Sequence, residues 1–315
     1  MKQPLFSVII PLYNKELYIA DTLSSVLNQT FSDFEVIIIN DCSTDKSVAK
    51  VATIANEQVQ IIHHKNNQGL SASRNTGFNY AKGEIICLLD ADDLWKPNFL
   101  TEIHNLYQQF PEAQFYGTEY EEQFFFGTLR TNKTISAECS GSNFLVDDFF
   151  SSNLGQPIVC QSSLTFKKSI LGETTHLFDA SITYAEDIDF YIKAFSKYKL
   201  AYCYKPLVTY RNDIPNQMVY SSIADKKYPD FKSYEHLATN NVSLQKYIDF
   251  HRYSFAINLR LEGSTTQAKK LINDINFNNI NSKQQFLLKS PLLLLKSIKA
   301  VKAWLLKKNI KVSTY

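Results

Sequence analysis

Short apolar runs alternate with longer amphipathic stretches over residues 1–110 of this 315-residue chain. A short, continuous apolar run is typical of a buried strand, and apolar positions three and four residues apart are typical of a helix. The predicted strands are Leu5–Ile10, Phe34–Ile39, Val59–His63 and Glu84–Leu89, and the predicted helices are Lys15–Asn28, Ser43–Asn56, Ser71–Ala81 and Lys96–Gln109. This alternation predicts right-handed crossovers and a doubly wound, parallel α/β sheet with helices on its faces.

The pattern is less regular between residues 111 and 220. The predicted strands are Phe115–Thr118 and Gln123–Leu129, as an antiparallel pair, then Ser162–Phe166, Leu200–Tyr204 and Leu207–Tyr210, and the predicted helices are Ser142–Phe150 and Glu186–Tyr198. We expect these elements to complete a mixed, mostly parallel sheet in one domain of residues 1–220, with halves at about 1–110 and 111–220. Helical patterns dominate afterwards, so residues 221–315 are predicted to form a helical C-terminal extension.

Composition favours a globular protein without disulfides. Hydrophobic residues make up 44% of the chain and charged residues 20%, which is ordinary for a globular domain. The five cysteines lack any Cys-x-x-Cys pair, which argues against a disulfide framework and a structural zinc site. No apolar run approaches the roughly 20 residues of a membrane span, and the chain opens on a strand pattern rather than a signal peptide. We therefore expect a cytoplasmic protein.

Charge is distributed unevenly along the chain. Residues 251–315 carry 12 Lys and Arg against two acids, whereas the rest carries 21 against 29. Residues 289–311 hold seven lysines and no acid, with apolar residues recurring on one helical face at Leu294, Ile298, Val301 and Leu305. Such a helix either makes a peripheral contact with the inner face of an anionic membrane or packs on the main domain or a protein partner. We do not expect nucleic acid as a partner, because these lysines have one aromatic neighbour and no stacking platform.

Polar clusters follow each of the first four predicted strands. They are Pro11-Leu12-Tyr13-Asn14, Asn40–Asp45, Asn66–Ser71 and Asp90-Ala91-Asp92-Asp93. Each cluster alone has an ordinary explanation as a turn or a helix cap. The carboxyl ends of parallel strands share one edge of a sheet, so these clusters are expected to converge on one crevice. Their joint placement favours a ligand of the nucleotide type.

Three carboxylates arrive within four positions at Asp90, Asp92 and Asp93. Buried acids are costly unless a cation or strong donors meet them. This cluster therefore indicates either a divalent metal holding a phosphorylated ligand or a solvated acidic turn that caps the next helix.

Two further candidates lie at predicted helix starts. Arg74, in the early turns after Ser71, suits a diphosphate or is simply a surface arginine. Asp187, in the run Tyr184–Phe190, is a candidate general base or one of several acids that favourably meet the helix dipole.

These motifs together resemble the inverting family 2 glycosyltransferases, which have the GT-A fold. The matching segments are Phe6–Asn14, Ile39–Asp45, Asn67–Gly77, Leu89–Asp93, Ala185–Asp189 and Pro206–Arg211. The resemblance covers about residues 5–215, and ordered motifs at matching intervals are far more specific than a lone motif. It implies a GT-A fold of the Rossmann-like type.

The resemblance also implies roles for individual residues. Donor binding is assigned to Pro11, Tyr13, Asn14, Asp41, Arg74, Asp90 and Ala91, with Asp41 on the base, Asp90 on the ribose and Arg74 on the diphosphate. Asp92 would ligate Mn²⁺ or Mg²⁺, and Asp187 would be the catalytic base. Many relatives have a histidine after the closing Tyr-Arg pair, but this chain has Asn212-Asp213, so a third metal contact from Asp213 is an open alternative.

The expected activity is metal-dependent transfer of a sugar from a nucleotide-diphosphate donor, expected to be a UDP-sugar, to a saccharide or lipid-linked acceptor during surface-polysaccharide synthesis. One alternative is a transferase acting on a polyprenyl phosphate, which needs no general base. Another is a catalytically silent protein that binds nucleotide sugars or acts as a scaffold.

Overall fold

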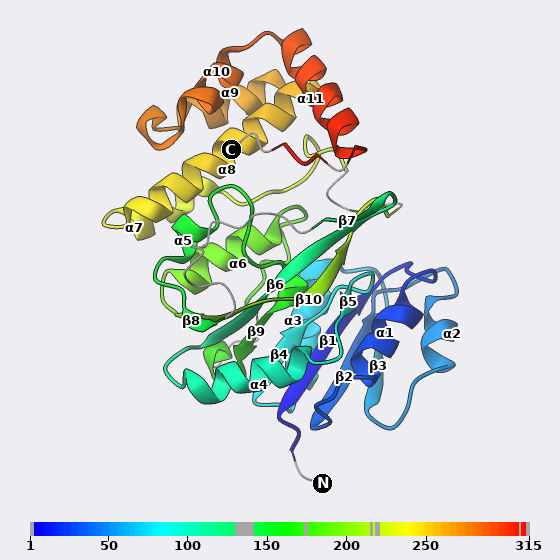
Figure 1. Ribbon diagram of the computed structural model, residues 1–315. Coiled ribbons are helices and arrows are strands. Elements are labelled where there is room, and N and C mark those ends of the chain that lie inside the picture. Colours follow the sequence, from blue (N-terminus) through cyan, green and yellow to red (C-terminus); the bar gives the residue numbers. More distant parts are fainter. Residues whose placement is uncertain are drawn as a thin grey trace.

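The computed structural model describes residues 3–129, 142–172, 176–214, 217, 221–308 and 310–312. A ten-stranded sheet runs through this part of the chain, with helices on both faces (Figure 1). Its main strand order is β3 (Val59–His63), β2 (Phe34–Asn40), β1 (Phe6–Leu12), β4 (Ile85–Leu88), β9 (Leu164–Lys167), β6 (Phe115–Phe124), β10 (Leu200–Arg211) and β5 (Leu94–Trp95). Two short strands extend it, with β7 (Gly127–Leu129) beside β6 and β8 (Asn143–Leu145) beside β10.

Strand direction brings the predicted site together at one edge. β1 pairs in parallel with β2 and β4, β2 with β3, and β6 with β10. β9 is antiparallel to both β4 and β6, so those two strands point the same way. The loops after β1, β2, β3, β4, β6 and β10 therefore leave the same edge, and the predicted mixed, mostly parallel sheet is confirmed.

The sheet separates two hydrophobic cores. Alternate side chains of a strand point to opposite faces, so Val8 and Ile10 of β1 pack into one core and Ile9 into the other. The first core is covered by α1 (Ile19–Leu27), α2 (Ser47–Ala52) and α4 (Phe99–Gln109), and the second by α3 (Leu70–Tyr80), α5 (Phe149–Ser152) and α6 (Glu186–Phe195). Burial on both faces explains why β1, β2 and β4 are continuous apolar runs rather than alternating apolar and polar residues.

A glycine sets the distance between α3 and β1. A Cβ atom at Gly77 would lie 2.3 Å from Cγ2 of Ile9, which is far inside van der Waals contact. Only glycine lets the helix approach the strand this closely. This close packing places the first turns of α3, including Arg74, beside the strand ends.

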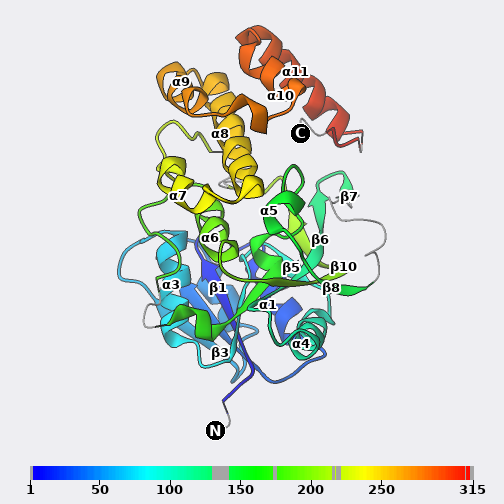
Figure 2. The ribbon, with the colours of Figure 1, turned by 90° about the vertical axis from the view of Figure 1, so that its left-hand side faces the viewer.

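The C-terminal extension is helical, as predicted. It comprises α7 (Glu235–Ala238), α8 (Val242–Glu262), α9 (Thr265–Asn273), α10 (Ser282–Lys289) and α11 (Leu292–Leu306), with short 3₁₀ turns at Phe231–Tyr234 and Phe277–Asn279. Figures 1 and 2 show these helices as a layer at one end of the molecule, away from the N-terminus. Buried residues of α8 belong to the same core as those of α6, so the domain boundary near residue 220 stays a prediction.

The sequence prediction was wrong in the irregular half. The predicted helix Ser142–Phe150 is instead strand β8 followed by α5, which Asp148 caps by accepting from the backbone N–H of Phe150. The strands predicted to end at Tyr204 and begin at Leu207 form one strand, β10, whose register with β6 shifts on either side of Pro206. Proline has no backbone N–H to donate to a neighbouring strand, so the continuous strand β10 has a bulge at this position. In the sequence, the proline therefore looks like the end of one strand and the start of another.

The predicted break after Thr118 is also absent. Phe115–Phe124 forms the single strand β6, and only its end turns back into β7 as the expected antiparallel partner. The helix predicted over Ser43–Asn56 is also shorter in the structure, where it is limited to α2. The preceding loop is held by Asp45, whose carboxylate accepts from the backbone N–H of Ser47.

Candidate active site

The loops after β1 and β2 are joined by hydrogen bonds. Asn14, which has a positive φ of 50°, accepts from the backbone N–H of Thr44 at 2.8 Å and donates its own N–H to Ser43 Oγ at 3.2 Å. The N–H of Lys15 donates to Ser47 Oγ at 2.7 Å. Tyr13, directly before Asn14, is 48% exposed, whereas Pro11 is buried within β1. The predicted donor-side residues thus form one rigid rim with an exposed aromatic ring.

Asp41 organises the next loop from a buried position. Its Oδ1 accepts from the backbone N–H of Gln68 at 2.8 Å and contacts Nδ1 of His64 at 2.7 Å, and its Oδ2 accepts from the N–H of Gly69 at 2.8 Å. The other ring nitrogen of His64 lies 2.9 Å from Oγ1 of Thr76, so His64 links Asp41 to α3. These contacts use three of the four lone-pair positions of the carboxylate. Base recognition by Asp41 stays a prediction and would use Oδ2.

Arg74 connects the two halves of the site. It is 1% exposed, and its Nη1 donates to Glu186 Oε1 at 2.8 Å while Nη2 donates to Asp90 Oδ1 at 2.9 Å. Its guanidinium also lies 4.9 Å from the centre of the Phe178 ring. Burial would lower the pKa of Arg74, but the two carboxylates outweigh burial and raise it. Arg74 therefore ties the end of β4 to the start of α6, and the predicted contact with a diphosphate stays a prediction.

The three carboxylates after β4 have different surroundings. Asp92 accepts from Nζ of Lys15 at 2.6 Å, and its side chain is 12% exposed. Burial raises the pKa of the Asp92 carboxyl, Lys15 opposes this, and the negative charge of Asp90 adds to it. Ala91, between the two acids, is buried and accepts from Oγ1 of Thr22 through its carbonyl at 3.0 Å.

Asp93 is buried and held by two hydrogen bonds. Its carboxylate accepts from Ser162 Oγ at 2.5 Å and from the backbone N–H of Arg211 at 3.0 Å. Burial raises the pKa of this carboxyl strongly, and the charges of Asp92 and Asp90 add to the effect. Ser162 also accepts from the N–H of Asp90 at 3.1 Å, so this pair fixes the acidic loop against β9 and β10.

Asp187 lies at the start of α6, beside the glutamate that binds Arg74. The helix is entered through Ala185, which has a left-handed φ of 59°, a conformation that non-glycine residues adopt mostly under constraint. Asp187 Oδ1 accepts from the N–H of Ile188 at 2.9 Å. Burial, assisted by the charge of Glu186 and opposed by Arg74, raises the pKa of the Asp187 carboxyl to about 7. A carboxyl with such a pKa is suited to accept a proton near neutral pH.

The acids after β4 suit a hard divalent cation, which prefers oxygen ligands. In the described ranges, however, no three His, Cys, Asp or Glu side chains are grouped so as to hold a metal ion. Asp213 does not complete such a group, and its Oδ2 instead lies 3.4 Å from the N–H of Phe125. Mg²⁺ is commonly held by one or two carboxylates together with substrate phosphates, so Asp90 and Asp92 fit a site that the donor completes.

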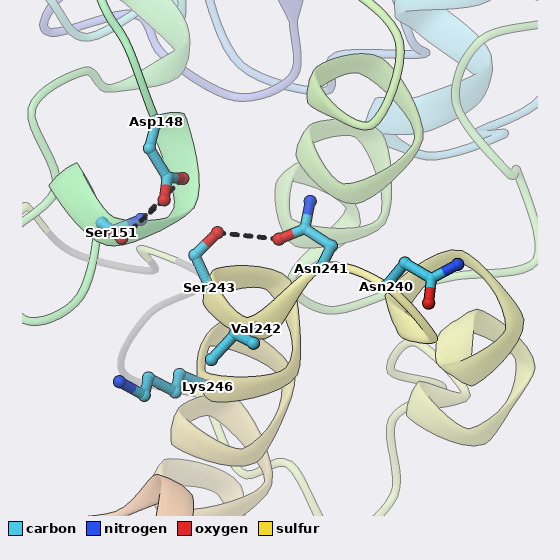
Figure 3. A pocket seen from close by; sticks show the side chains of 7 residues that line it. All are labelled: Asp148, Ser151, Asn240, Asn241, Val242, Ser243 and Lys246. Atoms are coloured by element: carbon cyan, nitrogen blue, oxygen red, sulfur yellow. Dashed lines mark hydrogen bonds between the residues drawn. The ribbon is translucent and has the colours of Figure 1, made fainter.

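Two hollows among the described residues lie away from the strand exits. One of about 370 Å³ separates α5 from the start of α8 and is lined by Asp148, Ser151, Asn240, Asn241, Val242, Ser243 and Lys246 (Figure 3). The other, of about 750 Å³, has Leu5 and Glu84 in its lining, at the opposite end of β1 and β4. Neither contains a predicted site residue.

Sequence reasoning overlooked two residues of this site. Lys15 directly follows the exposed loop at Tyr13-Asn14, and Glu186 directly precedes Asp187. Each has a charged partner distant in the sequence, and those pairings were not visible before the strands were placed.

Comparison with known proteins decides the family. Residues 7–174 match the model of Glycosyl transferase family 2. The chain belongs to this family. The match includes the loops after β1, β2 and β4 together with α3, which confirms the resemblance seen in the sequence.

Several relatives are described as glycosyltransferases. An uncharacterized glycosyltransferase of Haemophilus influenzae is 28% identical over 222 residues, which cover 66% of this chain and 65% of the relative. The Escherichia coli UDP-Glc:alpha-D-GlcNAc-diphosphoundecaprenol beta-1,3-glucosyltransferase WfgD is 36% identical over 100 residues, or 32% of this chain and 40% of that protein. The chain thus spans less than two thirds of the length of either relative.

The solved structure of TarS residues 1–349 from S. aureus in complex with UDP-GlcNAc has a similar fold. The TM-score is 0.69 at 19% sequence identity, covering 94% of this chain and 91% of that one. At this identity the likeness concerns the fold, and it confirms the expected GT-A type with its C-terminal helices.

Proposed function

We propose that this family 2 protein is an inverting glycosyltransferase that moves a sugar from a UDP-sugar to a hydroxyl of a saccharide or lipid-linked acceptor in cell-surface polysaccharide synthesis. The observation that carries the proposal is the bridge Asp90–Arg74–Glu186, which links the acidic loop after β4 to the residue next to Asp187. The TarS complex contains UDP-GlcNAc, and the name of WfgD gives a UDP-sugar donor and a lipid-linked acceptor. Both support the donor and acceptor classes by analogy.

Asp187 would act as the general base. Its carboxylate accepts the proton of the acceptor hydroxyl as that oxygen forms a bond to the anomeric carbon. The bond from this carbon to the diphosphate oxygen breaks, and its electron pair leaves with the diphosphate. Attack and departure on opposite sides of the carbon invert its configuration.

The donor-side residues would hold and stabilise the leaving diphosphate. Tyr13 offers an exposed ring to the base, Asp90 would contact the ribose, and Asp92 would hold Mn²⁺ or Mg²⁺ against the phosphates. When bound, such an ion neutralises negative charge that develops on the leaving group. Lys15 already contacts Asp92, so a cation at this acid shares the carboxylate with Lys15 or displaces it.

The variant Asp187→Asn tests the proposed base. We expect transfer to fall at least about a hundredfold, while donor affinity by calorimetry stays within about twofold. The folded-state pKa of about 7 lies above the ordinary value of 3.8, so the carboxyl stabilises the fold at low pH and this contribution is lost as pH rises through about 7. The variant should therefore be no less stable than the wild type above pH 7, which separates lost transfer from lost folding.

Asp274→Asn, an exposed change on the extension, is the matched control and should transfer normally. Normal transfer by Asp187→Asn would remove this residue as the base. Transfer to undecaprenyl phosphate but to no saccharide would favour the polyprenyl-phosphate alternative. Donor binding with neither transfer nor slow donor hydrolysis in Mn²⁺ would favour the catalytically silent alternative.

A further inference from the structure

Helix α11 uses only part of its circumference to pack on the molecule. Leu295 is buried, Ile298 and Lys302 are half-buried, and the helix contacts α8. A helix advances about 100° per residue, so these three share one face. From the sequence, this helix either packs on the protein or binds a membrane surface. In the structure, one face of α11 packs on the protein and another face is exposed.

The outer face of α11 carries large apolar side chains. Leu293 is 80% exposed, Val301 55% and Trp304 60%. Their helical positions fall together, roughly opposite Leu295 and Lys302. Exposed apolar side chains that gather on one face of a monomer commonly mark an interaction site.

Lysines border this outer face. Lys296, Lys299 and Lys307 are all exposed, Lys296 and Lys307 directly beside the apolar stripe and Lys299 further round towards the packed face. Residues 289–311 contain seven lysines and no acid, so no carboxylate within this stretch offsets their charge. An anionic partner is therefore favoured.

Both ends of α11 are held in place. Arg260 donates to the carbonyls of Leu287, Leu288 and Ser290 just before the helix. Beyond the helix, Nζ of Lys311 contacts Glu122 on β6 and Gln156. The outer face is thus presented on a fixed support, at the periphery of the molecule in Figures 1 and 2.

We propose that the outer face of α11, formed by Leu293, Val301 and Trp304 and bordered by Lys296, Lys299 and Lys307, docks the protein on an anionic lipid bilayer. Tryptophan and leucine enter the headgroup boundary while lysines meet anionic headgroups. Protein interfaces, in contrast, are depleted in lysine. Among the described residues no helix is long and apolar enough to cross a bilayer, so the contact is peripheral.

Docking this face would bring the end of β6 near the membrane, because Lys311 contacts Glu122 there. Glu122, the partner of Lys311, pairs with Tyr210 on β10, and the next residue, Arg211, binds Asp93. The inference itself does not depend on the proposed reaction, because vesicle binding is measured without substrate.

Tryptophan fluorescence provides a direct test. The chain has two tryptophans, and Trp95 is buried whereas Trp304 is exposed. Adding vesicles of phosphatidylcholine with phosphatidylglycerol should shift the emission of the full chain to the blue, and pure phosphatidylcholine should do so far less. Trp304→Ser should abolish the shift, and Lys296→Gln with Lys299→Gln should weaken vesicle co-sedimentation by roughly fivefold per lysine.

Val242→Ser is the matched control, since Val242 is 62% exposed at the start of α8 and lies outside this face. It should bind vesicles as the wild type does, and all variants should keep the wild-type unfolding temperature. Equal binding by wild type and Trp304→Ser, or no binding to anionic vesicles, would overturn the proposal. Light scattering that shows a dimer lost in Trp304→Ser, without vesicle binding, would assign the face to a second copy instead.

Discussion

At the residue scale, the acids of the site differ because each has different hydrogen-bonding and charged neighbours. Asp90 faces Arg74, Asp92 faces Lys15, and Asp93 is held by Ser162 and a backbone N–H. Asp187 has no ion pair with any residue that the structure describes, and burial together with the charge of Glu186 raises its pKa. The sequence singled out these acids from their motifs, and their roles stay predictions, but their pairing depends on contacts between distant segments that the sequence does not show.

Lys15 is expected to compete with a metal ion for Asp92. Replacing Lys15 by Met leaves the carboxylate oxygens free for the cation, and a partly exposed ion pair contributes up to about 1 kcal/mol. We expect Mn²⁺ to bind Lys15→Met roughly two- to fivefold more tightly in calorimetry without donor. Asp92→Asn should weaken Mn²⁺ binding, and Lys46→Met, an exposed change nearby, should not alter it. Weaker Mn²⁺ binding by Lys15→Met would show that Lys15 supports the site rather than competing.

Arg74 is expected to support the fold and the position of Asp187. Arg74→Ala leaves Glu186 buried without its cation, and losing one partner of a buried pair costs about 3 kcal/mol in unfolding free energy. Arg74→Lys should recover only part of this, since one ammonium cannot reproduce the two-pronged contact.

The pH dependence of transfer gives a second readout for Arg74. The positive charge of Arg74 lowers the pKa of Asp187. If the lysine in Arg74→Lys does not replace this charge at the same place, the pKa of Asp187 rises and transfer requires a higher pH. If the lysine does replace it, the pH dependence of transfer stays that of the wild type. A double-mutant cycle with Glu186→Gln measures the coupling. Additive effects in that cycle would contradict the bridge.

At the element scale, the regular half of the chain was predictable and the irregular half was not. The strands β1, β2 and β4 are buried on both faces and read directly as apolar runs, and the edge strand β3 is only partly buried. Pro206 interrupts the apolar pattern of β10, so the sequence predicted two strands there. The sequence predicted a helix over Ser142–Phe150, but this stretch holds strand β8 and only the start of α5. In both places a tertiary contact decides the outcome over the local pattern.

The packing of α3 on β1 gives a prediction at this scale. Gly77→Ala adds a Cβ that meets Cγ2 of Ile9, and overpacking of this kind costs about 1–3 kcal/mol in unfolding free energy. Chemical denaturation should show this loss. Ile9→Ala removes the clashing atoms, so the double variant should be more stable than the sum of the two single changes predicts. Strict additivity would show that the two residues do not meet.

At the scale of the whole molecule, one sheet edge collects residues from both halves of the chain. β9 and β10 bring residues 160–211 beside the N-terminal strands, and Arg74 completes the link to α6. The sequence indicated convergence of the first four loops, because parallel strands share an edge. It could not indicate how α6 faces them, nor that α11 packs with one face and exposes the other.

The most direct test of the central claim, that Asp187 takes the proton of the acceptor, is the pH profile of transfer. With a pKa of about 7, the base form of Asp187 becomes dominant above neutrality. We predict that kcat/KM rises about tenfold per pH unit from about pH 5 towards pH 7 and then levels off. A profile without such a rise between about pH 5 and pH 8, under conditions where donor binding is constant, would contradict the account.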